Sequence, residues 1–321
     1  MLLHVDDILF AMGKQHEYMV KDLSRRFIVC VITYDTFKYL GMQVEVTREN
    51  GVVTHVSVSQ EKYALSLQEG AYFKEKKVHE SLNELEHTEY RRVCRELQWL
   101  AQITRVDMAF KTMYLSLSLH APTIQDMKTA NQSLRKVQKN SLVLNYLPLT
   151  KNLQLYLYCD ASFAGLPCAS SCGGAVLYLT SDGLGNQRVA VPILWRSWKL
   201  RRVARSTLAA ETICACDALD RALPVKALAE FLFNCKIPLV LLSDCKSLVD
   251  CVLQTRKQSS ITEKRLLVDI QILREALAGV ELADIRWVDT KSQLADALTR
   301  AMSCNNLTAS FRACSVTSCD F

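Results

Sequence analysis

The second part of this chain contains no histidine. All six histidines of the 321 residues lie between His4 and His120. Imidazole is the commonest general acid and base in enzymes. Any hydrolysis carried out beyond His120 must therefore rely on carboxylates, thiols or metal ions.

Long apolar runs and regular cysteine motifs are also missing. No apolar run approaches the roughly 20 residues of a membrane-spanning helix, so we expect no membrane partner. The N-terminus lacks a basic segment followed by an apolar one, so we expect no signal peptide. The 13 cysteines are irregularly spaced and no C-x-x-C pair recurs. This argues against a zinc site and favours a reducing compartment, cytoplasmic or nuclear.

What is present is enough apolar material for two domains. Half of the 321 residues are hydrophobic, so two buried cores are possible. The formal net charge is +6 and the pI is about 8.6. This mild basic excess permits a polyanionic partner without requiring one.

The first half opens with the stretch LHVDDILF, in which Asp6 and Asp7 stand between apolar runs. The pattern predicts a hairpin with both aspartates at its turn. Paired carboxylates there suit a divalent cation, and an ordinary Asp-rich turn is the alternative. The other elements expected in this half are helices over 17–27, 60–68, 89–117 and 124–137, strands over 37–46 and 52–58, and a charged linker over 74–87.

The second half alternates strands and helices in a different way. Strands are expected over 153–159, 173–179, 189–195, 239–243 and 284–288, and helices over 206–222, after Asp244, over 263–278 and over 292–298. The first three strands form hairpins, whereas the later ones follow helical crossovers and lie parallel. The pattern predicts an α/β fold with a mixed five-stranded sheet flanked by helices. The polar tail, 303–321, has no periodicity and is expected to be disordered.

Four acids occupy meaningful positions in this half: Asp160, Glu211, Asp244 and Asp296. Asp160 and Asp244 close two strands, and reactive groups gather at the carboxyl ends of such strands. Glu211 and Asp296 lie near helix starts. Each acid alone also has a structural explanation, as a surface residue, a helix cap or a partner of the helix dipole.

If the four acids meet, they repel one another, and cations must compensate. Two Mg²⁺ ions would do so, activating a water and stabilising the leaving oxygen of a phosphodiester. Mn²⁺ is an alternative. We therefore predict that all four acids are catalytic and metal-binding.

Five segments of the second half resemble the RNase H domain of copia-type retrotransposon Pol polyproteins. They are YCDASFAG (158–165), LWRSWK (194–199), ARSTLAAE (204–211), LSDCKS (242–247) and QLADALT (293–299). The resemblance implies that the four acids bind two metal ions and cut the RNA strand of an RNA–DNA hybrid. Cys245 departs from the usual Asn, and the histidine of some RNase H enzymes has no counterpart.

The first half is similar to the reverse transcriptase of the same polyproteins. The segments are HVDD (4–7), FKYLGM (37–42), VSQEKY (58–63), YRRVCREL (90–97) and TRVD (104–107). The resemblance implies a palm remnant over 1–75, thumb and connection helices over 76–150 and an RNase H-like domain over 151–302. His4 and Val106 depart from the pattern.

This resemblance makes Asp6 and Asp7 a vestigial polymerase metal site. The fingers and early palm would precede Met1, so we expect no polymerase activity from this chain alone. The missing reverse-transcriptase part is a possible partner in trans.

Four basic residues precede the helix that carries Glu211: Lys199, Arg201, Arg202 and Arg205. Placed beside a metal site, they would meet phosphates of an RNA–DNA hybrid. Trp195 and Trp198 interleave with them, and one could contact a sugar or base face. The alternative is a core Trp195 and a solvated basic loop. A decayed element that binds nucleic acid or serves as an interaction module is the competing interpretation of the whole chain.

Overall fold

The computed structural model describes residues 2–4, 7–11, 17–29, 31–73, 75, 77–183, 187–254 and 263–317. Its largest sheet has six strands in the order β11-β10-β7-β8-β9-β12. The strands are β7 (Gln154–Leu166), β8 (Ser170–Asp182), β9 (Gln187–Lys199), β10 (Leu239–Ser243), β11 (Asp284–Trp287) and β12 (Ser315–Thr317). β7, β10 and β11 are parallel, and β8, β9 and β12 pair antiparallel. The predicted α/β class and mixed sheet are confirmed.

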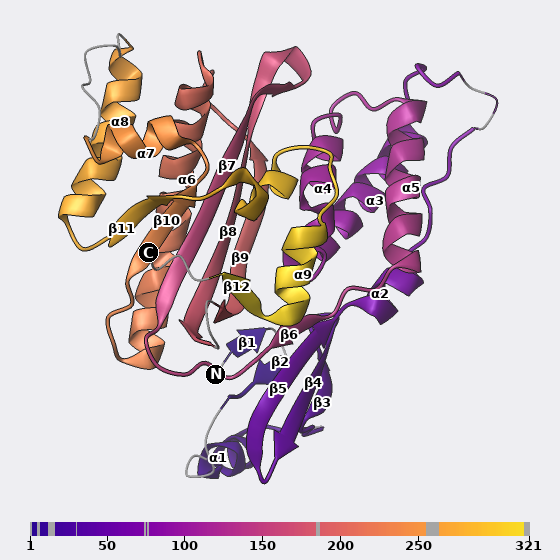
Figure 1. The fold of residues 1–321 in the computed structure, drawn as a ribbon. Coiled ribbons are helices and arrows are strands. Elements are labelled where there is room, and N and C mark those ends of the chain that lie inside the picture. The colour runs from indigo at the N-terminus through magenta and orange to yellow at the C-terminus, as the bar shows by residue number, and fades with distance from the viewer. Residues whose placement is uncertain are drawn as a thin grey trace.

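Helices cover both faces of this sheet (Figure 1). On one face lie α6 (Thr207–Phe233), α7 (Lys246–Val252) and α8 (Lys264–Ala278). On the other lies α9 (Asn305–Ala313), together with the 3₁₀ turns η4 (Thr290–Ser292) and η5 (Asp296–Leu298). Alternation along the strands sends successive side chains to opposite faces, so Leu157 and Cys159 pack towards α6 while Tyr156 and Tyr158 pack towards α9.

The N-terminal half contains a smaller sheet and a helical layer. The sheet order is β3 (Thr36–Tyr39), β4 (Met42–Glu49), β5 (Val52–Ser59) and β6 (Leu144–Tyr146). The helices are α1 (Tyr18–Arg26), α2 (Glu61–Ser66), α3 (Glu84–Ile103), α4 (Ala109–Ser116) and α5 (Ile124–Lys139), with 3₁₀ turns η2 (Val106–Met108) and, after β7, η3 (Pro167–Ala169). The opening hairpin pairs β1 (Leu2–His4) with β2 (Asp7–Leu9).

Local sequence explains where the long N-terminal helices begin. Asn83 accepts a hydrogen bond from the Glu86 amide while the Glu86 carboxylate accepts one from the Asn83 amide. Thr123 and Asp126 form the same reciprocal arrangement at the start of α5. Such capping boxes satisfy amides that the helix itself leaves unpaired. The charged segment expected as a linker therefore ends in the first turn of α3.

Over its described residues, 303–317, the tail was wrongly expected to be disordered. Within it, α9 buries Leu307 and Phe311 against the sheet, and β12 pairs with β9 as a sixth strand. The apolar side chains of α9 lie four residues apart, so they share one helix face. A polar composition hid this short amphipathic pattern.

Other predicted elements also differ from the structure. The single helix expected over 89–117 is α3 and α4, separated by the 3₁₀ turn η2. The expected strand over 37–46 is two strands, because Leu40 and Gly41 adopt positive φ angles of 49° and 77° and reverse the chain. The expected helix over 292–298 is a pair of 3₁₀ turns. The helix expected to end at Ala222 continues through Pro224 to Phe233, so the proline did not end it.

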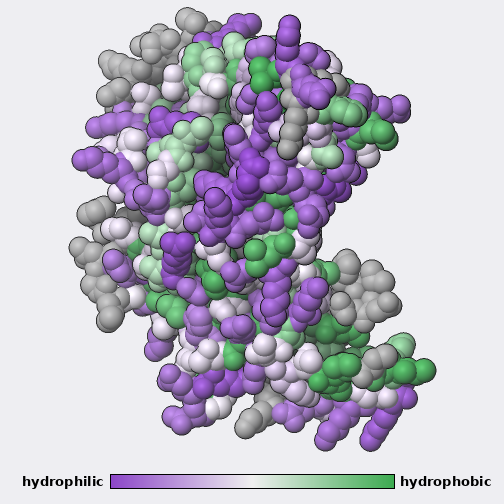
Figure 2. Space-filling view, turned by 90° about the vertical axis from the view of Figure 1, so that its right-hand side faces the viewer, coloured by the Kyte–Doolittle hydropathy of each residue, from purple (hydrophilic) through white to green (hydrophobic). Residues whose placement is uncertain are grey.

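The face shown in Figure 2 is hydrophilic over its middle, with hydrophobic side chains gathered towards its lower end, at the height of α1 in Figure 1. Among the described residues, no helix combines the length and apolar character needed to cross a membrane.

Candidate metal and nuclease site

Three acids from three separate elements converge at the end of the parallel strands. Asp160 lies on β7 two residues past Tyr158, the last residue that pairs with β10. Asp244 directly follows β10. Glu211 lies in the second turn of α6, which crosses the same sheet face. Asp160 therefore does not end its strand. β7 continues beyond Asp160, whereas the shorter β10 ends beside this residue.

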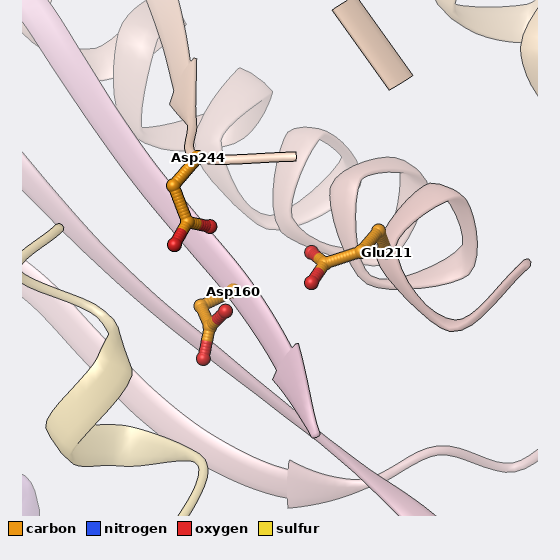
Figure 3. Close-up of side chains that lie close together, drawn as sticks. All are labelled: Asp160, Glu211 and Asp244. Atoms are coloured by element: carbon orange, nitrogen blue, oxygen red, sulfur yellow. The ribbon is translucent and has the colours of Figure 1, made fainter. Parts of the chain in front are cut away.

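The carboxylates of Asp160, Glu211 and Asp244 each bring one oxygen within 4.8 Å of the other two (Figure 3). Asp160 and Glu211 are buried and Asp244 is half-buried. In Figure 3 the three side chains point towards one common space. The fold therefore brings together three of the four acids that were predicted to meet.

Burial and mutual repulsion disfavour the charged forms of two of these acids. Burial, followed by the charges of Asp160 and Asp244, raises the pKa of Glu211 to about 9. Burial, with Asp244 and Asp296, raises the pKa of Asp160 to about 6, although a hydrogen bond from Thr299 opposes the shift. These are the shifts expected of acids crowded together without compensating positive charge.

The three acids fit a divalent cation. Oε2 of Glu211 is buried and accepts no hydrogen bond from the described residues. A buried acceptor without a partner is costly, and a cation would satisfy it. Carboxylate oxygens are the ligands that hard cations such as Mg²⁺ prefer. The donor set contains no thiol or imidazole, so it suits this class of ion.

Two threonine hydroxyls orient the acids. Thr299 Oγ1 donates to Asp160 Oδ2 at 2.5 Å, and Thr290 Oγ1 donates to Asp244 Oδ2 at 2.9 Å. The sequence did not indicate either role. Thr299 is the last residue of the QLADALT segment, and this motif could have indicated its role. Thr290 lies in a turn without a motif, so the sequence offered no indication of its role.

Asp296 takes a different position from the other three acids. It begins η5, is buried, and accepts a hydrogen bond from Arg300, the nearest guanidinium. It is close enough to raise the pKa of Asp160, yet it is not one of the three clustered acids. Its predicted role as a metal ligand stays a prediction.

The other predicted polar residues are two aspartates and four basic residues. Asp6 lies outside the described residues, and for Asp7 only the backbone, in β2, is described. Lys199 ends β9, and Arg201, Arg202 and Arg205 lie in the exposed loop that leads to α6. Of these, Arg202 pairs with Asp269 at 3.0 Å.

Both tryptophans near this loop are held by protein contacts. Trp195 Nε1 donates to the Ala101 carbonyl at 2.7 Å, and its ring packs on Phe311. Trp198 is buried, and its Nε1 donates to Asp217 at 3.1 Å. The half-buried Trp195 therefore links β9 to α3.

Comparison with known proteins finds similarity only among solved structures. Neither a protein-family model nor a curated protein sequence matches the chain. RNase H1 from the archaeon Halobacterium salinarum is 20% identical, with 46% of this chain and 94% of that chain covered and a TM-score of 0.33.

Two further structures show the same level of similarity. LC11-RNase H1 in complex with an RNA/DNA hybrid is 16% identical, covering 46% of this chain and 94% of that chain, with a TM-score of 0.34. The foamy viral protease-reverse transcriptase in complex with dsDNA is 15% identical, covering 48% and 96%, with a TM-score of 0.28. Because these values are low, we base the function on the acids and topology of this chain itself.

Proposed function

We propose that this chain is an RNase H-type nuclease that hydrolyses the RNA strand of RNA–DNA hybrids with divalent metal ions. The observation that carries the proposal is the convergence of Asp160, Glu211 and Asp244 within 4.8 Å from three elements far apart in sequence. If each acid were only a surface residue, a helix cap or a partner of the helix dipole, the three acids would not need to meet. Together, uncompensated, they destabilise the fold, and such a cost is typical of functional sites.

Each acid of the cluster has a distinct part in holding the metal ions. Asp160 is the central ligand, because Thr299 fixes one of its oxygens and leaves the other for an ion. Glu211 supplies the unpartnered Oε2, and Asp244 is oriented by Thr290. When bound, Mg²⁺ or Mn²⁺ supplies an activated water and stabilises the leaving oxygen. Asp296 is proposed as the fourth ligand once Arg300 releases it.

The proposed substrate is a hybrid duplex, supported by the basic loop between β9 and α6. Lys199, Arg201 and Arg205 are exposed and have no ion pair among the described residues. Cations beside a metal site attract phosphates, and the 2′-hydroxyl distinguishes the RNA strand.

We also propose that the chain derives from a copia-type retroelement Pol polyprotein, with residues 1–75 as palm remnant and 76–150 as thumb and connection. This rests on the resemblance of the N-terminal motifs. A role of Asp6 and Asp7 in a polymerase metal site belongs to the same proposal.

The test is cleavage of an end-labelled RNA–DNA hybrid by the full chain, with Mg²⁺. The variants are Asp160→Asn and, as a matched control on α6, Asp220→Asn, which removes an exposed acid outside the cluster. We expect cleavage of the RNA strand only, lost in Asp160→Asn and with a chelator, and kept in Asp220→Asn. Folded wild-type protein that binds the hybrid without cutting it would instead identify a decayed element that retains binding.

A further inference from the structure

A guanidinium group on α6, away from the acid cluster, has no hydrogen-bond or ion-pair partner among the described residues. The Arg221 guanidinium lies over the Trp198 ring, 4.9 Å from the ring centroid. The ring itself is held by the bond from Trp198 to Asp217. Arg221 Nε is buried and makes no hydrogen bond with the described residues. The protein thus fixes this cation in place without neutralising it.

Arg196 lies close enough to both Arg221 and Arg201 to be affected by their charges. Arg196 is two residues before Trp198 on β9, so both side chains leave the same face of the strand. Partial burial, followed by the like charges of Arg221 and Arg201, lowers the pKa of Arg196. Among the described residues, none of the three arginines forms an ion pair. Three neighbouring cations repel one another unless an anion joins them.

A groove of about 210 Å³ lies between β9 and the helices α3 and α4, and of the three arginines Arg196 lines it. Its charged lining residues are Arg196 and Lys199, and none of the described residues that line it carries a carboxylate. The groove therefore offers an anionic chain a path with cations on one wall and neutral polar groups, such as Gln98 and Gln102, on the other.

We propose that Arg196 and Arg221, continuing from Arg201 of the basic loop, form a binding site for the phosphate backbone of a nucleic-acid duplex that extends beyond the cleavage site. This inference rests on the proposed function, because the same helix carries Glu211 and Arg221. Ten helical residues span about 15 Å. One guanidinium group can donate two parallel N–H bonds to a phosphate, so each arginine suits this ligand.

The experiment measures binding of an 18-base-pair RNA–DNA hybrid in Mg²⁺, using the full chain with Asp160→Asn to prevent cleavage. The test variant adds Arg196→Gln and Arg201→Gln. The matched control adds Arg25→Gln and Arg312→Gln, two exposed arginines on α1 and α9. Both variants lose the same charge, so a general loss of positive potential affects them equally. Circular dichroism confirms that each is folded.

We expect the test variant to lose about 1.8 from the slope of log K against log salt concentration, since each phosphate contact contributes about 0.9. Between 50 and 200 mM salt, the affinity of the parent then falls about twelvefold further than that of the test variant. The control keeps the slope of the parent. A test variant with the same salt slope as the parent overturns the site. So does poly-glutamate that competes for binding as effectively as the hybrid at the same charge concentration.

The outcome is separable from that of the nuclease proposal. If the wild-type chain fails to cut the hybrid, the nuclease proposal fails, while the salt slopes still decide whether the arginines contact phosphates.

Discussion

The hydroxyl of Thr299 donates a hydrogen bond to Oδ2 of Asp160 at 2.5 Å, across 139 positions of the sequence. The bond fastens η5 to β7 at the acid cluster. It also lowers the pKa of Asp160 against the opposing effects of burial and of Asp244. A residue without metal-binding chemistry of its own thus favours the charged form of an acid proposed to hold a cation.

Replacing Thr299 with Val keeps the shape of the side chain and removes this donor. Hydrogen bonds to charged groups contribute about 1.5–3 kcal/mol. We expect cleavage to fall roughly tenfold to a hundredfold. The acidic limb of the pH–rate profile should move to higher pH, because Asp160 becomes harder to ionise. A profile that keeps its position would contradict the role given to Thr299, and Thr299→Ser is the control that restores the donor.

Removing a clustered acid should separate activity from stability. Asp160→Asn or Glu211→Gln deletes a proposed metal ligand, which removes several kcal/mol of transition-state stabilisation, or roughly a thousandfold in rate. The same changes relieve repulsion, so the metal-free melting temperature should stay level or rise. Steady-state cleavage and thermal unfolding in a chelator measure the two effects. A marked loss of stability in both variants would indicate that the acids serve the fold.

The stability of the metal-free protein should fall as the pH rises from about 4 to about 9. The folded-state pKa values of Asp160 and Glu211, about 6 and about 9, lie above their ordinary values of 3.8 and 4.5. In this window the unfolded chain binds fewer protons than the folded one, so deprotonation favours unfolding. The stability that these two acids contribute is fully present below their ordinary pKa values and is lost above their raised pKa values.

Urea unfolding of the reduced protein across this pH range tests that dependence. Glu211→Gln should flatten the curve between about pH 6 and pH 9, and added Mg²⁺ should flatten it in the wild type. A slope that survives both treatments would assign the effect to other groups.

Releasing Asp296 from Arg300 should strengthen metal binding. The Arg300 guanidinium bonds to Asp296 and would compete with an ion for it. We expect Arg300→Ala to lower, and Asp296→Asn to raise, the Mg²⁺ concentration that half-saturates the increase in melting temperature. Thermal unfolding during a Mg²⁺ titration provides the measurement without relying on catalysis. Equal half-saturation in both variants would place Asp296 outside the metal site.

The C-terminal helix should contribute to the stability of the fold. Phe311 is fully buried among Tyr178 and Trp195, with edge-to-face ring contacts to both. Phe311→Ala should lower the free energy of unfolding by about 3–5 kcal/mol. Arg312→Ala, an exposed neighbour on the same helix, should change it by about 0.5 kcal/mol or less. Urea denaturation of the two variants is the comparison, and similar midpoints would mean that α9 is not part of the cooperative fold.

Local patterns were enough to predict much of the second half. Apolar runs predicted β10 at its observed bounds, and Gly279 marked the end of α8. Order along the chain, with three hairpin strands before the helical crossover, predicted a mixed sheet. These features depend on residues close in sequence, which is why periodicity and turn signals reveal them.

Contacts distant in sequence decided the rest. The tail is polar in composition, yet it forms α9 and β12 because Phe311 packs against the sheet. One departure was local instead: Leu40 and Gly41 divided one expected strand into two, because β3 and β4 pair directly across this turn.

The candidate site shows the same division. The sequence alone determined which acids are available, whereas the pairing of β7 with β10, which makes Asp160 and Asp244 neighbours, belongs to the tertiary structure. Only the tertiary structure decided that Glu211 leaves an oxygen unpartnered, that Thr299 and Thr290 hold the other acids, and that Asp296 turns to Arg300. The physical reason is that burial and hydrogen bonding depend on what surrounds a side chain in three dimensions, and residues distant in the chain supply those surroundings.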